Sequence, residues 1–247
     1  MIITLISDFG TVDGYVGEMK GVLLSRAPGV TIVDVTHDIP PQDVESARLT
    51  LARVWRRFPI GAVHLVVVDP GVGSSRAALA VDSDGHRFVG PDNGVLSPAL
   101  LVPGARAIAL PVPAHAAPTF HGRDVFAPAA AALAMGAALR DLGGDATAPV
   151  VRRTPEPTRT PDGSLQGEVI AIDRFGNATT NLAAVYGGTV CVGDTSLALR
   201  ETYADVAAGS ATALVGSSGF IEIAVRDGSA ARQLGLHRGT HVSLRPA

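Results

Sequence analysis

The chain has 247 residues, of which 47% are hydrophobic and 17% are charged, and its formal net charge is −3. This composition is typical of a globular protein with a substantial core and excludes an intrinsically disordered chain. The slightly acidic balance offers no electrostatic basis for nucleic-acid binding, which normally requires a basic face.

The first half of the chain alternates apolar runs with segments of helical periodicity. Strands are predicted at residues 2–6, 30–35 and 63–68, and helices at residues 14–26 and 43–56. In the first helix, Val16, Met19 and Leu23 fall on one apolar stripe. Strands that alternate with helices over short connections are typical of a parallel sheet covered by helices.

A β-hairpin is predicted next, with arms at residues 77–82 and 87–89 and a turn at Ser83-Asp84-Gly85. Asp82 to Gly85 also resembles the start of a calcium loop. The other ligands and the distal glutamate of such a loop are missing, so a turn is the better interpretation. Residues 90–94 have loop composition, and a further strand and helix are predicted at residues 107–110 and 125–135.

Residues 152–164 contain three prolines and one glycine and are predicted to be a linker. Short apolar runs separated by turns follow, which predict strands at residues 167–172, 189–192, 196–199, 211–215, 220–225 and 240–244. Only residues 230–234 have helical character. We therefore expect an N-terminal α/β domain with a mostly parallel sheet at residues 1–151, and a smaller all-β, barrel-like domain at residues 165–247.

The chain contains no segment typical of targeting or membrane insertion. Met1 to Ile6 is apolar, but it lacks a basic start and reaches Asp8 too soon for a signal peptide. No run approaches the roughly 18 apolar residues of a membrane span. The single cysteine, Cys191, excludes an internal disulfide and fits a reducing compartment. We expect a cytoplasmic protein without membrane or nucleic-acid partners.

Polar clusters follow the predicted strands at the points where the strands end. Asp8, Asp38 and Asp69 come directly after the first three strands. Ligands of parallel sheets bind outside the carboxyl ends of the strands, so Asp8 and Asp69 are predicted to share one pocket. Each aspartate alone could equally cap the next helix or turn.

Several kinds of site are excluded by their missing motifs. The chain has no HxH pair and no cysteine cluster, so we expect no metal site, and His37 beside Asp38 is better interpreted as a local hydrogen-bonding residue. Gly71-Val72-Gly73 is too short for a dinucleotide fingerprint, and no P-loop is present. No GxSxG nucleophile elbow occurs.

Asp69, Arg76 and His121 remain as a candidate catalytic set, each beside glycines or at a strand end. A histidine and a carboxylate can orient and deprotonate a water, which typically contributes about 100- to 10,000-fold in rate. The permanently charged arginine would stabilise a hydroxide-like nucleophile. The alternatives are a turn cap for Asp69, a surface charge for Arg76 and a hydrogen-bonded core histidine for His121.

Five ordered motifs give the chain a family resemblance. They are Ser7-Asp8-Phe9-Gly10, Asp69-Pro70-Gly71-Val72-Gly73, Pro91-Asp92-Asn93-Gly94, Phe120-His121-Gly122-Arg123-Asp124 and Asp173-Arg174-Phe175-Gly176-Asn177. These motifs and the segment Gly219-Phe220-Ile221-Glu222 make the chain resemble the adenosyl-methionine hydroxide adenosyltransferases. The members of that family are adenosine-forming hydrolases related to fluorinating and chlorinating enzymes. The resemblance covers nearly the whole chain.

The resemblance implies a two-domain chain that forms a homotrimer, with each site between the first domain of one subunit and the second domain of its neighbour. It implies a metal-independent displacement at the 5′ carbon of adenosyl-methionine by water-derived hydroxide, which gives adenosine and L-methionine. Adenosyl-methionine is then the substrate, and no further cofactor is expected. Asp69, Arg76 and His121 match the water-activating residues of the family.

The same resemblance implies the substrate-binding residues. Asp8 matches the aspartate that holds the ribose hydroxyls, and Asn177 matches the residue that reads the adenine edge. Tyr203 matches an aromatic that stacks on adenine. The positions around the methionine moiety are Asp13, Asp173, Ser217 and Ser218, and Phe175 and Glu222 complete the implied set.

Departures from the halogenating branch favour water as the nucleophile. Gly122 stands where the fluorinating relatives have a halide-binding serine, and Asp69 and His121 replace tyrosines. An anionic Asp69 would repel a halide at close range, whereas water suffers no such penalty. A halogenase, a non-catalytic adenosyl-methionine or adenosine binding module, and a hydrolase with a metal-bound ribose remain as alternatives.

Overall fold

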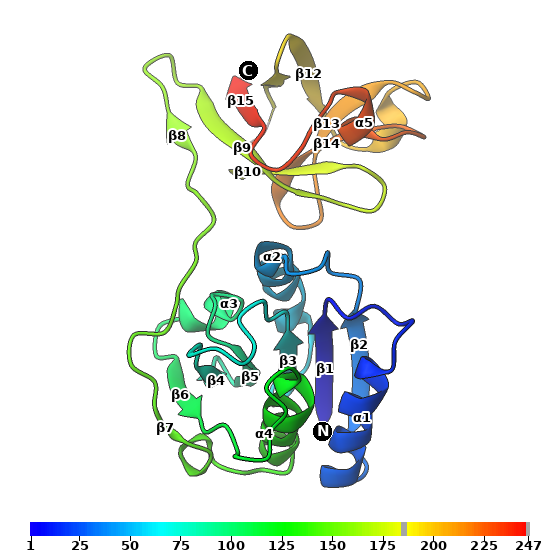
Figure 1. The fold of residues 1–247 in the computed structure, drawn as a ribbon. Coiled ribbons are helices and arrows are strands. Elements are labelled where there is room, and N and C mark those ends of the chain that lie inside the picture. The colour runs from blue at the N-terminus through cyan, green and yellow to red at the C-terminus, as the bar shows by residue number, and fades with distance from the viewer. Residues whose placement is uncertain (184–186, 246–247) are drawn as a thin grey trace. The chain divides into compact units, whose positions relative to one another are not determined.

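A computed structural model describes residues 1–183 and 187–245 (Figure 1). The chain divides into two compact units, Met1–Arg152 and Arg153–Ala247. Each unit has its own hydrophobic core, and each is described separately below.

The first unit is built on a seven-stranded sheet in the order β2-β1-β3-β5-β4-β6-β7. Its strands are β1 (Ile2–Ser7), β2 (Thr31–Thr36), β3 (Val63–Val67), β4 (Ala78–Ser83), β5 (His86–Pro91), β6 (Arg106–Leu110) and β7 (Gly144–Asp145). The pairs β1–β2, β1–β3 and β3–β5 are parallel, whereas β4 runs antiparallel to both of its neighbours. The predicted α/β class with a mostly parallel sheet is confirmed.

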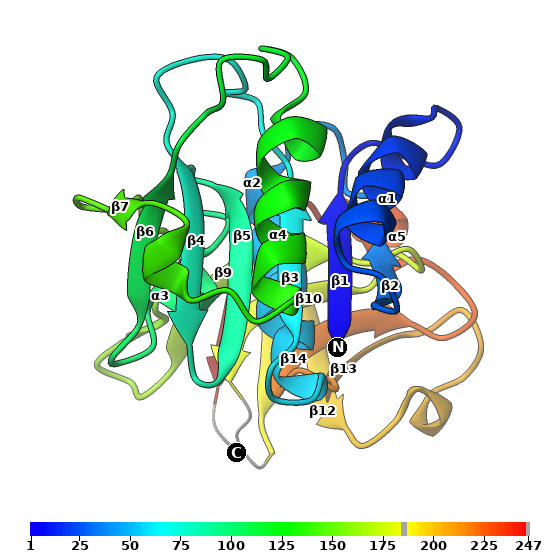
Figure 2. The ribbon, with the colours of Figure 1, turned by 90° about the horizontal axis from the view of Figure 1, so that it is seen from below.

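Helices cover both faces of this sheet. The helices α1 (Tyr15–Arg26) and α4 (Ala127–Ala134) pack on one face of the sheet (Figure 2). Met19 and Leu23 of α1 are fully buried in the core on that face. The helices α2 (Val44–Val54) and α3 (Ser97–Leu100) pack on the other face. The strands are buried between two apolar layers, which explains why β1 and β3 carry apolar side chains on both faces instead of alternating apolar and exposed polar residues.

Local details extend the predicted elements of the first unit. Asp43 caps α2 by accepting a hydrogen bond from the Ser46 backbone N–H, and the predicted helix ends with a 3₁₀ turn at Trp55–Arg57. In the β4–β5 hairpin, Asp84 and Gly85 have φ values of 51° and 74°, as a tight hairpin turn requires, so the turn interpretation is confirmed over the calcium loop. The helix α3 and the short strand β7 were not predicted.

The second unit is a barrel-like sheet in which each strand pairs with the next and the first strand pairs with the last. The order is β10-β14-β13-β12-β11-β15-β9, and β10 also pairs with β9, while β8 (Thr158–Arg159) adds to the outer edge of β9. The other strands are β9 (Leu165–Ile172), β10 (Ala178–Ala183), β11 (Thr189–Val192), β12 (Thr195–Arg200), β13 (Ala211–Val215), β14 (Phe220–Val225) and β15 (His241–Arg245). The short helix α5 (Ala230–Gln233) follows β14.

The sequence pattern did not predict two strands of the second unit, β10 and β8. The strand β10 carries the buried polar residues Thr180 and Asn181, so it lacks an apolar alternation. Thr180 instead donates to the Ile221 carbonyl, and Asn181 donates to the Pro155 carbonyl. The predicted linker also contains the strand β8.

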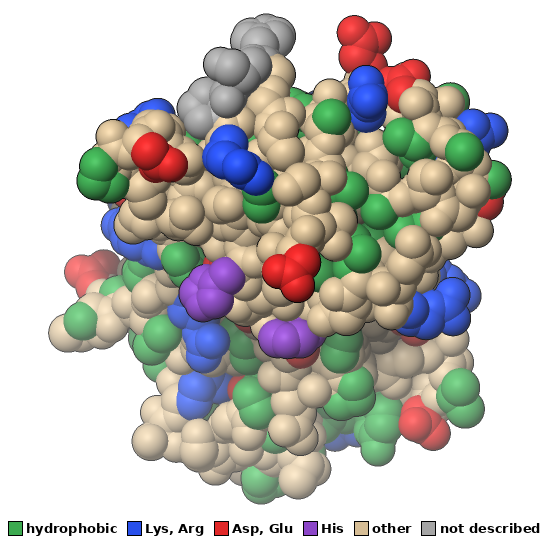
Figure 3. Space-filling model, turned by 90° about the horizontal axis from the view of Figure 1, so that it is seen from above, with side chains coloured by type: hydrophobic (Ala, Val, Ile, Leu, Met, Phe, Trp, Pro, Cys, Tyr) green, Lys and Arg blue, Asp and Glu red, His purple; other side chains and the backbone are tan. Residues whose placement is uncertain are grey.

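The described residues include no helix that is both long and apolar enough to cross a membrane. On the face shown in Figure 3, lysine and arginine side chains are scattered among neutral surface instead of forming one continuous basic patch.

Candidate active site

Asp69 and Arg76 form a bidentate ion pair at the carboxyl end of β3. Arg76 Nε donates to Asp69 Oδ1 at 3.0 Å, and Arg76 Nη2 donates to Asp69 Oδ2. The two side chains are 6% and 8% exposed, so water screens this pair much less than a surface pair. The turn between them begins with the Val72 N–H, which donates to the Asp69 carbonyl. A buried pair with this geometry holds the carboxylate in one orientation.

Arg76 also reaches His121. Its Nη2 lies 3.3 Å from His121 Nδ1, and because a guanidinium can only donate, Nδ1 accepts and the neutral ring carries its hydrogen on Nε2. A further donor of Arg76, on Nη1, binds the Ala77 carbonyl at 2.9 Å. Four of the five N–H donors of Arg76 are therefore engaged within the protein. Arg76 is the bridge that brings Asp69 and His121 together.

The environment moves the pKa values of Asp69 and His121 toward each other. Burial raises the pKa of Asp69 above its ordinary value, against the opposing charge of Arg76. Burial, and then the charge of Arg76, lower the pKa of His121. The carboxylate thus becomes a better proton acceptor than a free aspartate, while the imidazole stays neutral.

His121 stands at the start of a π-helical turn, Gly122–Phe126, whereas the sequence pattern predicted a helix only from residue 125. Such turns are rare and often occur at functional sites. Asp124 stabilises this turn because its Oδ2 accepts the Ala117 N–H at 2.8 Å and its carboxylate binds Arg123. Arg123 in turn donates to Glu18 of α1 at 2.7 Å. The Arg123 contacts lower the pKa of Asp124 to about 2, so Asp124 is ionised at neutral pH.

Asp8 lies at the same edge of the sheet as Asp69. Ser7 is paired with Val67 in the register of β1 and β3, so the residues that follow these two strands are neighbours. Asp8 Oδ2 accepts the Gln42 N–H at 2.7 Å, and the buried Ser7 and His37 are joined by a 2.7 Å hydrogen bond. His37 therefore supports this loop through Ser7 rather than through Asp38.

Asp13 and Gly122 occupy contrasting environments. Asp13 is exposed just before α1, and no hydrogen bond or ion pair among the described residues holds its side chain.

Gly122 is buried, and a Cβ added there would lie 3.0 Å from Met19 Sδ and 3.2 Å from Phe120 Cε2. The structure thus leaves little space for a larger residue beside His121.

In the second unit, Asp173 organises the turn between β9 and β10. Its Oδ1 accepts the N–H groups of Phe175 and Asn177 at 2.9 Å each, and its Oδ2 accepts Asn177 Nδ2 at 3.0 Å. The Asp173 carboxylate, which the resemblance places near the methionine moiety of the substrate, therefore already accepts three hydrogen bonds within its own turn. Phe175 is 75% exposed, whereas Asn177 is almost fully buried, so this turn presents an aromatic ring and holds the amide in place.

A second group of predicted residues gathers at β14. Tyr203 donates from its hydroxyl to Glu222 Oε1, and this hydrogen bond is the main cause that raises the pKa of Tyr203 to about 12. The charge of Asp173 also contributes to raising the pKa of Tyr203. Ser217 and Ser218 are exposed in the turn between β13 and β14, and a Cβ on Gly216 would lie 3.2 Å from Glu222 Oε2.

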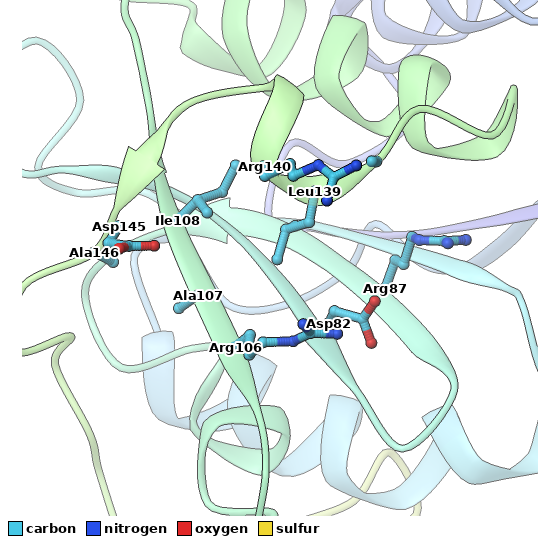
Figure 4. A pocket seen from close by; sticks show the side chains of 10 residues that line it. Asp82, Arg87, Arg106, Ala107, Ile108, Leu139, Arg140, Asp145 and Ala146 are labelled. Atoms are coloured by element: carbon cyan, nitrogen blue, oxygen red, sulfur yellow. The ribbon is translucent and has the colours of Figure 1, made fainter.

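A hollow of about 590 Å³ lies elsewhere in the first unit (Figure 4). Its charged lining residues are Asp82, Arg87, Arg106, Arg140 and Asp145. Arg87 pairs with Val63 at the start of β3, which is the end of the strand opposite to Asp69. The hollow is therefore separate from the Asp69–Arg76–His121 set. Within residues 1–183 and 187–245, no three His, Cys, Asp or Glu side chains are grouped to hold a metal ion.

Sequence reasoning missed the supporting residues. Ser7, Gln42 and Asn93 hold the segments that carry Asp8 and Asp69 through hydrogen bonds that each join residues 25 to 34 positions apart. The one available signal was that Ser7 and Asn93 belong to the short polar motifs at strand ends.

Family models match both units. The model described as SAM hydroxide adenosyltransferase N-terminal domain matches residues 3–143, and the corresponding C-terminal domain model matches residues 167–243. A protein of Thermus thermophilus named (R)-S-adenosyl-L-methionine hydrolase is 46% identical over 97% of each chain.

More distant matches include a fluorinase of Actinopolyspora mzabensis, which is 31% identical over 98% of this chain and 96% of its own. The crystal structure of an uncharacterized conserved protein from Thermotoga maritima superimposes with a TM-score of 0.89 at 33% identity, and covers 99% of both chains.

Proposed function

Because this chain belongs to the SAM hydroxide adenosyltransferase family, we propose that it hydrolyses (R)-S-adenosyl-L-methionine to adenosine and L-methionine. The observation that carries the proposal is the buried constellation of Asp69, Arg76 and His121 at the carboxyl edge of the sheet. These three residues supply a base, a fixed positive charge and a neutral imidazole.

In the proposed reaction, the oxygen of a water attacks the 5′ carbon of the ribose as the bond from that carbon to the sulfonium sulfur breaks. The sulfur keeps the electron pair and leaves as neutral L-methionine, so the leaving group needs no proton. The water loses one proton to the protein. Alignment of water, carbon and sulfur in a closed site can contribute roughly 7–11 kcal/mol to lowering the barrier.

Asp69 is the base in this proposal, because burial raises its pKa whereas that of His121 is lowered. His121 Nδ1 is taken by Arg76, so its Nε2–H is the group that orients the water oxygen. Arg76 holds both groups in place, and its charge stabilises the developing hydroxide.

The remaining predicted residues are assigned to the substrate. Asp8 holds the ribose hydroxyls, Asn177 reads the adenine edge, and Tyr203 with Phe175 offers aromatic faces to the base, for which stacking contributes about 1–3 kcal/mol. Asp13, Asp173, Ser217, Ser218 and Glu222 surround the methionine moiety. Adenosyl-methionine is the substrate in this scheme, and no further cofactor takes part.

We also propose that the chain acts as a cytoplasmic homotrimer, with residues 1–151 and 165–247 as its two functional domains and residues 152–164 as the linker. The proposed site residues are divided between the two units, since the catalytic set lies in Met1–Arg152 and most substrate-binding residues lie in Arg153–Ala247. In the trimer, the first unit of one subunit is completed by the second unit of its neighbour.

The test is to incubate the purified protein with adenosyl-methionine and chloride in oxygen-18 water and to identify the products by mass spectrometry. We expect free methionine and adenosine labelled at the 5′ oxygen. A 5′-chloro nucleoside would indicate a halogenase instead, and tight binding without product would indicate a non-catalytic binding module. Unchanged activity in excess chelator separates the proposal from a metal-dependent hydrolase.

A further inference from the structure

The side chain of Asn93 links the end of β3 to a loop that follows β5. Asn93 Nδ2 donates to the Val68 carbonyl at 2.9 Å, and its Oδ1 accepts the Val95 N–H at 3.1 Å. Val68 is fully buried, immediately precedes Asp69, and lies beyond the last residue pair between β1 and β3. One amide group therefore closes its own turn and also holds the backbone that carries Asp69.

The same loop contacts the backbone next to Arg76. The Asp92 N–H donates to the Ala77 carbonyl at 2.8 Å, and Arg76 Nη1 donates to that same carbonyl at 2.9 Å. Two consecutive loop residues, Asp92 and Asn93, thus bind the peptide groups adjacent to both members of the buried ion pair.

The chain also leaves the first unit along this loop. Asp92 Oδ1 accepts the Val150 N–H at 2.7 Å, and Arg152 Nε donates to the Asn93 carbonyl at 2.9 Å. Gly94 has a φ of 95°, and a Cβ there would lie 2.5 Å from Arg152 Cγ, so this position accepts only glycine. The loop is therefore held on one side by β3 and on the other by the segment that leads to the second unit.

We propose that the loop at residues 92–97 is the support that sets the geometry of the Asp69–Arg76 pair, and that Asn93 is a positioning residue that acts through the Val68 carbonyl. This inference rests on the proposed hydrolysis, in which the Asp69 carboxylate must meet one water at one place. Displacement of a catalytic group by about 1 Å can lower a rate about 100-fold. The bond from Asn93 limits that displacement.

The decisive variant is Asn93→Asp, which keeps the shape and the Oδ1 acceptor for Val95 but removes the donor to Val68. We expect kcat for adenosine formation to fall by about 100-fold, while KM changes little because Asn93 is not among the proposed substrate-binding residues. Asn93→Ala, which adds no charge, should show a loss of kcat of similar or greater size. In an Asp69→Asn background, Asn93→Ala should not lower kcat further, because the carboxylate that Asn93 positions is already absent.

A matched control lies in the second unit. Asn181 Oδ1 accepts the Glu168 N–H at 2.7 Å, and its Nδ2 donates to the Pro155 carbonyl at 2.9 Å, so Asn181→Asp makes the same chemical change outside the proposed site. It should lose stability in a thermal melt and keep the wild-type kcat. An equal loss of kcat in Asn181→Asp would overturn the positioning role in favour of a general loss of stability.

The outcomes separate this inference from the proposed function. A wild-type protein that forms no adenosine refutes the function itself. Wild-type activity with an unchanged kcat in folded Asn93→Asp refutes only the role of Asn93. If Asn93→Asp does not fold, Arg152→Ala reaches the same loop from its other side; a lower kcat then supports the inference, and an unchanged kcat contradicts it.

Discussion

At the scale of single residues, the chemistry depends on how three side chains share hydrogen bonds. Arg76 uses most of its donors to hold Asp69 and His121, and the burial of the pair leaves the carboxylate with a raised pKa. Asp69 is therefore both fixed in direction and more basic than a free aspartate. The proposed water activation needs both properties, because a base must point at its proton and must also hold it.

Replacing Asp69 with asparagine should remove turnover and preserve substrate binding. Asparagine has the same shape and can still accept a hydrogen bond from Arg76, but it cannot take a proton. We expect kcat to fall by about 100- to 10,000-fold, the usual contribution of a general base. Single-turnover kinetics and calorimetric titration with adenosyl-methionine separate the two effects. Asp145→Asn in the remote hollow is the control, and unaltered turnover in Asp69→Asn would contradict the assignment.

The dependence of kcat on pH should follow the two shifted groups. The active form needs an ionised Asp69 and a neutral His121. A raised pKa of Asp69 means that activity falls on acidification at a higher pH than an ordinary aspartate would give, whereas the lowered pKa of His121 keeps the ring neutral below its ordinary range. We expect a single acid limb between the ordinary values of the two groups, measured by initial rates at saturating substrate. A limb at or below the ordinary pKa of aspartate would contradict a raised pKa of Asp69.

Gly122 should not accept the serine of the halogenating relatives without loss. A new Cβ would lie 3.0 Å from Met19 Sδ and 3.3 Å from Val67 Cγ1, so Gly122→Ser should destabilise the fold by about 1–3 kcal/mol. Because Asp69 remains, the product in the presence of chloride should still be adenosine. Urea unfolding and mass spectrometry measure the two effects. Gly21→Ser, where a Cβ meets nothing within 4 Å, is the control.

At the scale of elements, the site depends on how strands and turns end. The register of β1 and β3 pairs Ser7 with Val67, so Asp8 and Asp69 both lie at the carboxyl edge of the sheet. The π-helical turn then presents His121 to Arg76 and is fastened to α1 by Arg123 and Glu18. None of these arrangements uses an unusual residue type. Each depends on where an element stops and on what closes its last turn.

The Asp124 carboxylate should make the stability of this turn depend on pH. Its folded pKa is about 2, below the ordinary value of 3.8, so its contribution is present above pH 3.8 and is lost as the pH falls toward 2. Asp124→Asn should therefore be less stable than the wild type at neutral pH and should lose less stability on acidification. Urea unfolding at neutral and acidic pH measures the difference. Equal acid sensitivity of the two proteins would contradict this linkage.

At the scale of the whole molecule, the proposed site residues are distributed over two compact units. The catalytic set lies in the sheet of the first unit, and the turn at Asp173 and the group around Tyr203 and Glu222 lie in the barrel of the second. Phe175 is 75% exposed, although phenylalanine is among the residue types most often buried. The proposed intersubunit site rests on this distribution.

Subunit complementation tests that arrangement. Asp69→Asn and Asn177→Ala chains with different tags should each be inactive as homo-oligomers. In a purified mixed oligomer, an intact first unit from one chain meets an intact second unit from the other, so activity should return. Light scattering should give the mass of a trimer. A mixed oligomer without activity would place the whole site within one chain.

The amino-acid sequence by itself determined what depends on near neighbours along the chain. The apolar runs of β1 and β3, the stripe of Met19 and Leu23 and the Asp84-Gly85 turn all follow from local periodicity and turn chemistry. The motifs that define the family were equally visible. The strand β10 was not, because its buried Thr180 and Asn181 are satisfied by distant carbonyls rather than by a local pattern.

Only the tertiary structure decided how the motifs act on one another. Asp69 and Arg76 lie seven residues apart in one turn, whereas His121 follows 45 residues after Arg76, and the tertiary structure joins the three side chains through one guanidinium. The link from Asn93 to Val68 spans 25 positions and had no local signal. Hydrogen bonds and burial between distant segments set directions and pKa values, and these depend on the folded arrangement rather than on the order of residues.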